Sequence, residues 1–285
     1  MLGFFAFGAL APVEQPKLEV IHRPPSTTRR RGVPPLLFVH GAYAGAWCWD
    51  EHFLPWFAAH GFDAYALSLR GHGASQGGER LQQSTIRDYV ADLRHVVEGM
   101  ETPPVLIGHS MGGMVVQKYL EQFPASAAVL MASVPPGGLG SSIMRLATAD
   151  PLVFTRMSMV QGGGLDPVDK DNAVRSILPQ DLDPEVETAY STRMLSESQR
   201  ALLDMTFMDL PQRWRMHLPP MPVLGAGQDS AFSVAEVEDT ARTYGADLQI
   251  YPEMAHAMML ETDWPLVARE IRDWVLARSD ELMAA

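Results

Sequence analysis

The chain of 285 residues contains a single cysteine, Cys48, so it cannot form an intramolecular disulfide. It also lacks any apolar run near the roughly 20 residues that cross a bilayer, and we expect no integral membrane segment. Basic residues are few: 22 Lys and Arg stand against 34 Asp and Glu, a formal net charge of −12. This charge argues against nucleic acid or an anionic membrane surface as the main partner. We therefore expect a cytoplasmic protein, as a monomer or homodimer, with a small-molecule substrate.

Patterns that bind metals or nucleotides are missing as well. The nine histidines form no His-x-x-x-His or His/Cys pair, and no glycine fingerprint follows the first predicted strand. The sequence therefore implies neither a metal nor an organic cofactor. The first eleven residues, Met1 to Ala11, are apolar but lack the basic start of a secretory signal, and we interpret them as structural.

Short apolar runs alternate with amphipathic helical segments along most of the chain. We predict strands over Lys17–His22, Pro35–Val39, Ala64–Leu69, Val105–Ile107, Ala127–Met131, Met221–Ala226 and Leu248–Tyr251. Thr85-x-x-Asp88 is typical of a capping box that begins a helix, and a last helix is expected near Asp263. This alternation predicts an α/β fold with a mostly parallel, doubly wound sheet.

The pattern changes between Pro135 and Pro219, where strand-like runs disappear. This stretch contains seven of the 17 methionines, and methionine makes adaptable apolar pockets. We predict that residues 1–135 and 219–285 form the core and that residues 136–218 form an inserted helical cap. The cap is expected to govern substrate choice and to contribute little to the chemical step. The seven are Met144, Met157, Met159, Met194, Met205, Met208 and Met216.

The most informative stretch is Gly108-His-Ser-Met-Gly112, between a predicted buried strand and a helix that begins at Met111. The chain must turn here in very little space, which requires small residues on either side of Ser110. Such a turn presents the Ser110 hydroxyl above the sheet, next to the positive end of the helix. The surrounding strand and helix favour a nucleophilic serine over an incidental glycine-rich turn.

Gly-His-Ser-Met-Gly-Gly resembles the nucleophile elbow of the α/β-hydrolase superfamily, in the form found in its serine esterases and lipases. Epoxide hydrolases and haloalkane dehalogenases of that superfamily have Asp at this position, so the resemblance argues against them. The run from His40 to Trp49 is similar to the corresponding loop of plant methylesterases and hydroxynitrile lyases. In the resemblance, the residue after His40-Gly41 lends a backbone N–H to the oxyanion hole, which implies Ala42 and Met111 as donors.

A serine nucleophile needs a base, and the base needs an orienting acid. Ser110, Asp229 and His256 follow predicted strands and occur in the order that this superfamily uses. We predict these three as the catalytic triad, with His72 and His109 as scaffolding. The alternative acids are Asp247 and Asp263, which also flank late elements.

The sequence thus predicts a serine hydrolase that cleaves a small-to-medium apolar carboxylic ester through an acyl-enzyme. A carbon–carbon bond hydrolase with the same triad is an alternative. So is a hydroxynitrile-lyase-like enzyme, although such lyases have Lys after the catalytic His and Thr in the oxyanion loop, where this chain has Ala257 and Ala42. A third alternative is a non-catalytic ligand receptor on a hydrolase scaffold.

Overall fold

The computed structural model describes residues 15–149 and 182–283, and within them seven strands form one sheet in the order β1-β3-β2-β4-β5-β6-β7. β1 pairs with β3 in antiparallel fashion, and all other neighbours are parallel. This confirms the predicted α/β class with a mostly parallel sheet. The strands are β1 (Glu19–Arg23), β2 (Leu36–Val39), β3 (Ala64–Ser68), β4 (Val105–His109), β5 (Ala127–Met131), β6 (Pro222–Ala226) and β7 (Asp247–Tyr251).

The middle of the sheet is its most buried part. Every residue of β2, β4, β5 and β6 is buried, whereas β1 and β7 at the two edges are partly exposed. Continuous burial is expected for parallel strands because helices cover both faces. In register, Gly108 of β4 lies between Val39 of β2 and Leu130 of β5. The end of β4 is therefore held on both sides.

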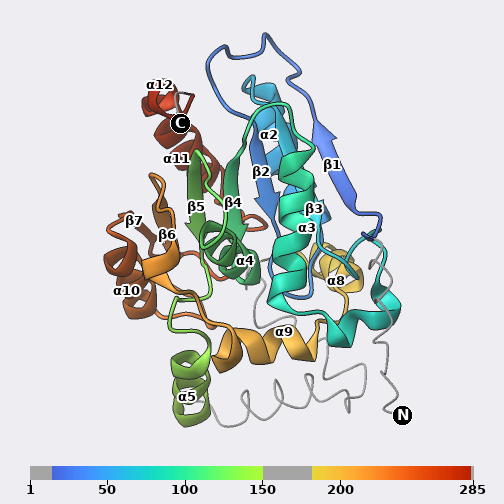
Figure 1. Cartoon of the computed structure of the whole chain (residues 1–285), viewed down its shortest axis with the longest axis vertical. Coiled ribbons are helices and arrows are strands. Elements are labelled where there is room, and N and C mark those ends of the chain that lie inside the picture. Colours follow the sequence, from blue (N-terminus) through green and yellow to red (C-terminus); the bar gives the residue numbers. More distant parts are fainter. Residues whose placement is uncertain (1–14, 150–181, 284–285) are drawn as a thin grey trace, which may run out of the picture.

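Helices pack on both faces of the sheet (Figure 1). One apolar cluster joins the sheet to α1 (Trp47–Asp50), α2 (Phe53–Ala59) and α11 (Trp264–Ala277). The other joins it to α3 (Ile86–Glu98), α4 (Met111–Leu120) and α10 (Val234–Tyr244). Two short elements, η1 (Gly78–Gln83) and α12 (Ser279–Leu282), complete the core.

Helix α3 shows how the sequence specifies these elements. The Thr85 hydroxyl accepts a hydrogen bond from the Asp88 N–H, and the Asp88 carboxylate accepts one from the Thr85 N–H. This confirms the predicted capping box, which satisfies N–H groups at the helix start. Ile86, Tyr89 and Leu93 recur at helical spacing and are all buried.

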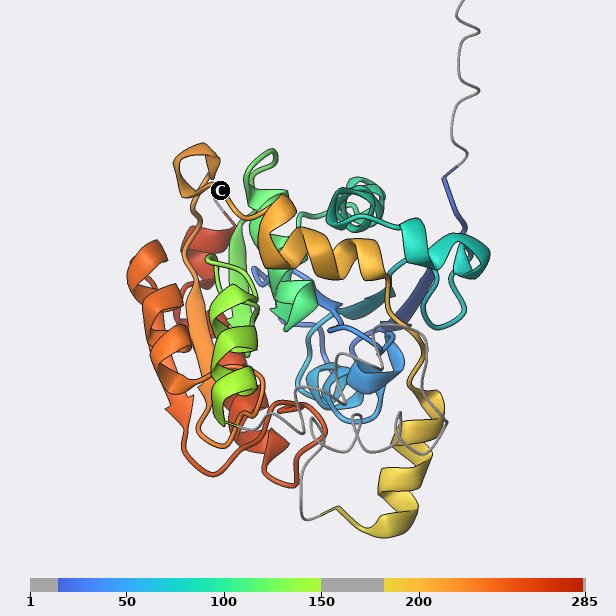
Figure 2. The same cartoon turned by 90° about the horizontal axis from the view of Figure 1, so that it is seen from below.

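The inserted segment, which we define as residues 136–218, is helical in its described parts and contributes no strand there. Figure 1 shows α5 and α9 beyond the ends of the parallel strands, and Figure 2 looks onto that side of the molecule. Met157, Met159, the glycine-rich stretch 161–165 and the first eleven residues lie outside the described residues. The elements are α5 (Gly140–Ala149), α8 (Pro184–Arg193), α9 (Gln199–Leu203), the π-helical turn η2 (Asp204–Met208) and η3 (Arg213–Arg215).

Across the described ranges, no helix has both the length and the apolar character needed to span a membrane.

Candidate active site

Ser110 occupies the tight turn between β4 and α4. Its backbone has φ 52° and ψ −119°, a region that residues with a side chain rarely adopt. A Cβ on Gly108 would lie 2.5 Å from the carbonyl oxygen of Gly112, and one on Gly112 would lie 2.3 Å from that of Val39. Only glycine at both positions lets β4, α4 and β2 approach so closely. The strained turn places Ser110 in the wall of a cavity.

The structure brings the three predicted triad residues together. The His256 Nε2 atom lies 3.0 Å from the Ser110 Oγ, and the His256 Nδ1 atom lies 2.8 Å from Asp229 Oδ2. All three residues are buried. Ser110 follows β4, Asp229 follows β6, and His256 follows β7, so all three come from the same edge of the sheet.

A second set of hydrogen bonds fixes the orientation of Asp229. Its Oδ1 atom accepts from the N–H of Ala231 at 2.7 Å and from that of Phe232 at 3.1 Å. The N–H of Gln228 donates to the carbonyl of Met254 at 2.8 Å, which joins the loop after β6 to the loop after β7. The carboxylate therefore keeps Oδ2 directed at His256.

The alternative acids lie elsewhere. Asp247 is the first residue of β7, at the end of that strand opposite to His256, and accepts hydrogen bonds from Trp274 and Arg278. Asp263 is the N-cap residue of α11. The carboxylate in contact with His256 is that of Asp229.

The predicted oxyanion donors, Ala42 and Met111, line the same cavity as Ser110. Met111 is the first residue of α4, where N–H groups have no partner within the helix. A Cβ on Gly41 would lie 3.0 Å from the Ser110 Cβ. The turn that carries Ala42 thus packs directly against the serine.

His40 supports this turn through its ring. Its Nε2 atom accepts a hydrogen bond from the N–H of Leu69, so Nδ1 must carry the proton that it donates to the carbonyl of Gly41 at 2.7 Å. Burial, with a smaller effect of His72, lowers the pKa of His40 to about 3. His40 is therefore a neutral structural residue.

His109 holds the backbone of His256. Its Nε2 atom lies 2.9 Å from the carbonyl oxygen of His256, to which it donates. Complete burial is the main cause that holds the pKa of His109 well below its usual value, and the nearby His256 adds to it. A neutral, buried ring agrees with the interpretation of His109 as scaffolding.

The cavity beside Ser110 has a volume of about 190 Å³ and a mostly apolar wall. The core contributes side chains such as Trp47, Phe232 and Leu260, and α5 contributes Ile143 and Leu146. A larger hollow of about 1240 Å³, beside β1 and the end of α3, contains none of the predicted site residues. The smaller cavity is the candidate substrate site, because Ser110 and His256 lie in its wall.

The methionines of the inserted segment divide into two groups. Met194 and Met205 are buried and line the cavity. Met144 and Met208 are exposed, at 66% and 57%, and Met216 packs on the core away from the cavity wall. Of the five methionines of this segment that the structure describes, two therefore line the cavity.

The Cys48 thiol also lines the cavity. Complete burial raises the pKa of this thiol far above the usual value and outweighs the opposing effects of Arg193 and of backbone hydrogen bonds. A neutral thiol is a weak nucleophile.

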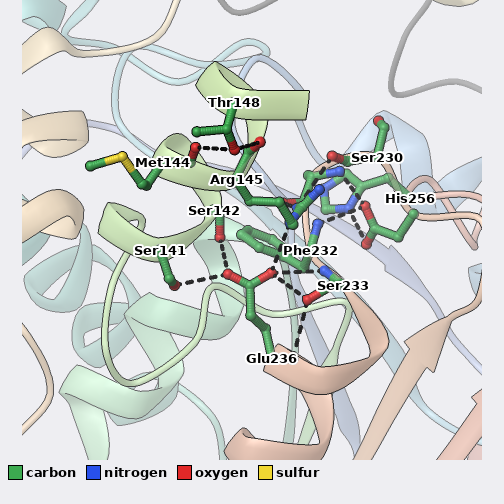
Figure 3. A network of polar contacts seen from close by, with 12 residues as sticks. Ser141, Ser142, Met144, Arg145, Thr148, Ser230, Phe232, Ser233, Glu236 and His256 are labelled. Carbon is green, nitrogen blue, oxygen red and sulfur yellow. Dashed lines mark hydrogen bonds and ion pairs between the residues drawn. The ribbon is translucent and has the colours of Figure 1, made fainter. Parts of the chain in front are cut away.

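Two residues that the sequence analysis missed join α5 to the loop of Asp229 (Figure 3). The Arg145 Nη2 atom donates to the carbonyl of Ala231 at 2.6 Å. The Glu236 carboxylate accepts from the hydroxyls of Ser141 and Ser142 at 2.8 and 2.7 Å and forms a capping box with Ser233. The pattern Ser233-x-x-Glu236 is a sequence signal for the capping box at the start of α10. No sequence signal indicates that Glu236 also contacts α5.

The described residues contain no cluster of three or more His, Cys, Asp or Glu side chains arranged to hold a metal ion. The absence of a metal or cofactor requirement stays a prediction.

The arrangement is that of a known fold family. Residues 36–270 match the alpha/beta hydrolase family, so the chain belongs to that family. A monoacylglycerol lipase of Mycolicibacterium smegmatis is 26% identical over 265 residues, which cover 88% of this chain and 90% of the lipase. Methyl jasmonate esterase 1 of Vitis vinifera is 34% identical over 106 residues, which cover 35% of this chain and 40% of that esterase.

Solved structures agree with the fold. A thermophilic esterase from Thermogutta terrifontis superposes with a TM-score of 0.71 at 20% identity, covering 95% of this chain and 96% of the esterase. An esterase from Exiguobacterium antarcticum gives a TM-score of 0.70 at 15% identity, covering 92% and 97%. These structures show the fold, and the family match together with the lipase and esterase relatives in sequence places the chain among the esterase and lipase type of alpha/beta hydrolases.

Proposed function

We propose that the protein is a cofactor-independent serine hydrolase that cleaves a small-to-medium apolar carboxylic ester through an acyl-enzyme. The observation that supports this most is the hydrogen-bonded series Ser110–His256–Asp229 at the wall of an apolar cavity. Its localisation in the cytoplasm and its state as monomer or homodimer stay predictions.

In the first half of the reaction, the His256 Nε2 atom takes the Ser110 proton while Oγ attacks the ester carbonyl carbon. Asp229 holds the tautomer of His256 that leaves Nε2 free to accept that proton, and it stabilises the imidazolium. The imidazolium then protonates the departing alcohol, which leaves an acyl group on Ser110. Water, activated by His256, attacks the acyl carbon and releases the acid.

Negative charge develops on the carbonyl oxygen in each half of the reaction. We assign its stabilisation to the N–H groups of Ala42 and Met111. A single donor of this kind typically contributes about 3 kcal/mol to transition-state stabilisation.

The cavity favours a compact apolar acyl group. Its volume of about 190 Å³ lies below the range of about 300–1,000 Å³ that is common for drug-sized ligands. The similarity to a monoacylglycerol lipase over most of the chain supports an ester substrate. The other candidate functions have less support: Ala257 and Ala42 stand where the lyase-like alternative needs Lys and Thr, and a non-catalytic receptor has no need of a hydrogen-bonded triad.

The deciding experiment combines fluorophosphonate labelling with a series of p-nitrophenyl esters. We expect labelling at Ser110 and turnover that falls as the acyl chain lengthens. Ser110→Ala should abolish both with an unchanged melting temperature, a loss of about six orders of magnitude in kcat. A control is Ser126→Ala, because Ser126 is also buried but precedes β5 at the opposite edge of the sheet.

Ser110→Ala activity within about tenfold of the wild type would contradict the assignment of the nucleophile. Binding of esters without labelling or turnover would favour a receptor.

A further inference from the structure

In the described part of the inserted segment, Glu197 has a carboxylate that is inaccessible to solvent and lies just before α9. Its Oε1 atom accepts from the Tyr89 hydroxyl at 2.7 Å and from the Ser198 N–H at 2.7 Å. Its Oε2 atom accepts from His72 Nε2 at 3.0 Å and from the Tyr43 N–H at 3.3 Å. Four donors therefore satisfy the two oxygens, which is what burial of a charge requires.

His72 and Glu197 form an ion pair whose side chains are both inaccessible to solvent. Burial alone would lower the pKa of His72, but the charge and hydrogen bond of Glu197 outweigh it, so that pKa lies above its usual value. Burial would raise the pKa of Glu197, but His72 and the other donors hold it below its usual value. The second ring nitrogen of His72 donates to the carbonyl of Arg70, as an imidazolium can.

The segment around Glu197 binds both backbone polar groups of Tyr43. While the Tyr43 N–H donates to Glu197, the Tyr43 carbonyl accepts from the N–H of Leu195 at 2.8 Å. Tyr43 has φ 65°, a left-handed conformation that is uncommon for a bulky residue and needs support from its surroundings. Tyr43 directly follows Ala42, whose N–H we assign to the oxyanion hole.

We propose that Glu197 is a positioning residue for the reaction, which holds the turn at Tyr43 so that the Ala42 N–H is directed at the oxyanion. The inserted segment then contributes to the chemical step as well as to substrate choice. This inference rests on the proposed function, because an oxyanion forms only if Ser110 attacks a carbonyl.

Stability alone does not account for the arrangement. Buried ion pairs are often no more stabilising than apolar residues of similar volume, because both charges lose their hydration. What the pair does fix is geometry: Glu197 joins Tyr43, His72 and Tyr89, which are 154, 125 and 108 residues away along the chain. A displacement of about 1 Å in such a site can cost about a hundredfold in rate.

The test is Glu197→Gln in the full-length protein, assayed with p-nitrophenyl butyrate and an alkyl trifluoromethyl ketone. The ketone reports on the oxyanion site, because Ser110 Oγ adds to its carbonyl carbon, the proton moves to His256 and the carbonyl oxygen becomes an oxyanion. We expect kcat to fall about 10- to 100-fold with KM within about twofold, and the inhibition constant of the ketone to rise by the same factor.

Asp204→Asn is the matched control. Asp204 is a buried carboxylate of the same segment and accepts from the Ile86 N–H at the start of α3, away from Tyr43. Its substitution should leave kcat and ketone inhibition within about threefold of the wild type. If Glu197→Gln does not fold, Leu195→Pro removes the other contact with Tyr43 at a partly exposed position, and Met194 already has the extended ψ of 134° that a following proline favours. We expect the same pattern, with a smaller loss.

The outcomes separate the two proposals. If the wild type neither turns over esters nor binds the ketone at Ser110, the proposed function and this inference both fail. If the wild type does both but Glu197→Gln keeps its kcat, or loses no more than Asp204→Asn, the inference alone is wrong. A fall in kcat that is matched by weaker ketone binding, and absent from the control, supports it.

Discussion

The core and the inserted segment hold their parts of the site in different ways. The core supplies Ser110, Asp229 and His256 from residues that directly follow strands, so the sheet itself sets their spacing. The inserted segment reaches the same site through long-range polar contacts, chiefly Glu197 to Tyr43 and Arg145 to Ala231. The core is thus held by continuous backbone pairing, whereas the described part of the segment is held by side-chain contacts, apolar packing and single backbone hydrogen bonds such as that from Leu195 to Tyr43.

From this difference we expect substitutions in the two regions to act differently. In the core, a changed triad residue removes a chemical group from a frame that stays in place. In the inserted segment, a changed residue alters the shape of the cavity or the hold on the oxyanion turn. We therefore expect large rate effects with little change in stability from the core, and smaller, substrate- or pH-dependent effects from the segment.

After Ser110→Ala, the largest effect that we expect in the core concerns its acid, Asp229. Asp229→Asn should lower kcat by about four orders of magnitude, because an amide N–H facing His256 Nδ1 favours the wrong tautomer. The remaining amide oxygen can still accept from the N–H groups of Ala231 and Phe232, so the loop should keep its shape. Steady-state kinetics with p-nitrophenyl butyrate measure the loss.

Asp247→Asn is the control for this prediction, because Asp247 lies at the other end of β7 and contacts Trp274 and Arg278. It should retain full activity. If Asp229→Asn loses less than tenfold in kcat, Asp229 is not the acid that orients His256, and the core would not differ from the segment in the size of its effects.

Much of the core could be predicted from the sequence. The glycines around Ser110, the Thr85-x-x-Asp88 pattern and the apolar strand runs are local signals, and the structure has strands and the capping box where they indicated, with ends that differ by one or two residues. The triad candidates could be placed on one edge because parallel strands end on the same side. This rule favours Asp229 over Asp247 only if β7 is parallel, and the sequence does not give the direction of an edge strand; β1, at the other edge, is antiparallel.

The contacts of the inserted segment could not be predicted in the same way. Glu197 and Arg145 have no neighbouring pattern that marks them, and their partners are 154 and 86 residues distant along the chain. A solvent-exposed glutamate and a buried one look alike in a sequence. The methionine count likewise indicated an apolar pocket, but only packing shows that Met194 and Met205 line it while Met144 and Met208 do not.

The next largest effect concerns these methionines. Met205→Ala and Met194→Ala should enlarge the cavity and raise kcat/KM for longer acyl chains relative to butyrate by about tenfold, since one methylene in an apolar pocket contributes about 1–3 kcal/mol. The measurement is a set of kcat/KM values from acetyl to decanoyl esters. The exposed variants Met144→Ala and Met208→Ala serve as controls and should keep the wild-type ranking. An unchanged ranking in all four variants would show that Met194 and Met205 do not bound the acyl site.

The smallest effect is the pH dependence of stability that the His72–Glu197 pair confers. The pKa of His72 is higher in the folded protein than its usual 6.5, so its stabilisation is complete below that value and is lost as the pH rises through the folded pKa. The pKa of Glu197 is below its usual 4.5, so its stabilisation is present above that value and is lost as the pH falls through the folded pKa. The ion pair should therefore contribute most in the mildly acidic range between the two usual values. Burial lowers the pKa of His72, and besides Glu197 the Arg70 carbonyl and Asp92 raise it; the neutral His40 ring lies 5.1 Å away.

Glu197→Gln should accordingly lower the melting temperature more at about pH 6 than at about pH 9, where a deprotonated His72 leaves the Glu197 carboxylate without its counter-charge. Each pKa unit by which folding shifts a group corresponds to about 1.4 kcal/mol, and 1 kcal/mol shifts the melting temperature of a domain of this size by roughly 2 °C. Thermal unfolding of wild type and variant at the two pH values measures the difference. Ser198→Ala is the control, because its buried hydroxyl donates to the Ser84 carbonyl at 2.6 Å and neither group titrates, so its deficit should be the same at both pH values. If the deficit of Glu197→Gln is equally independent of pH, the pair is not charged in the folded protein, and the carboxylate holds Tyr43 as a neutral acceptor.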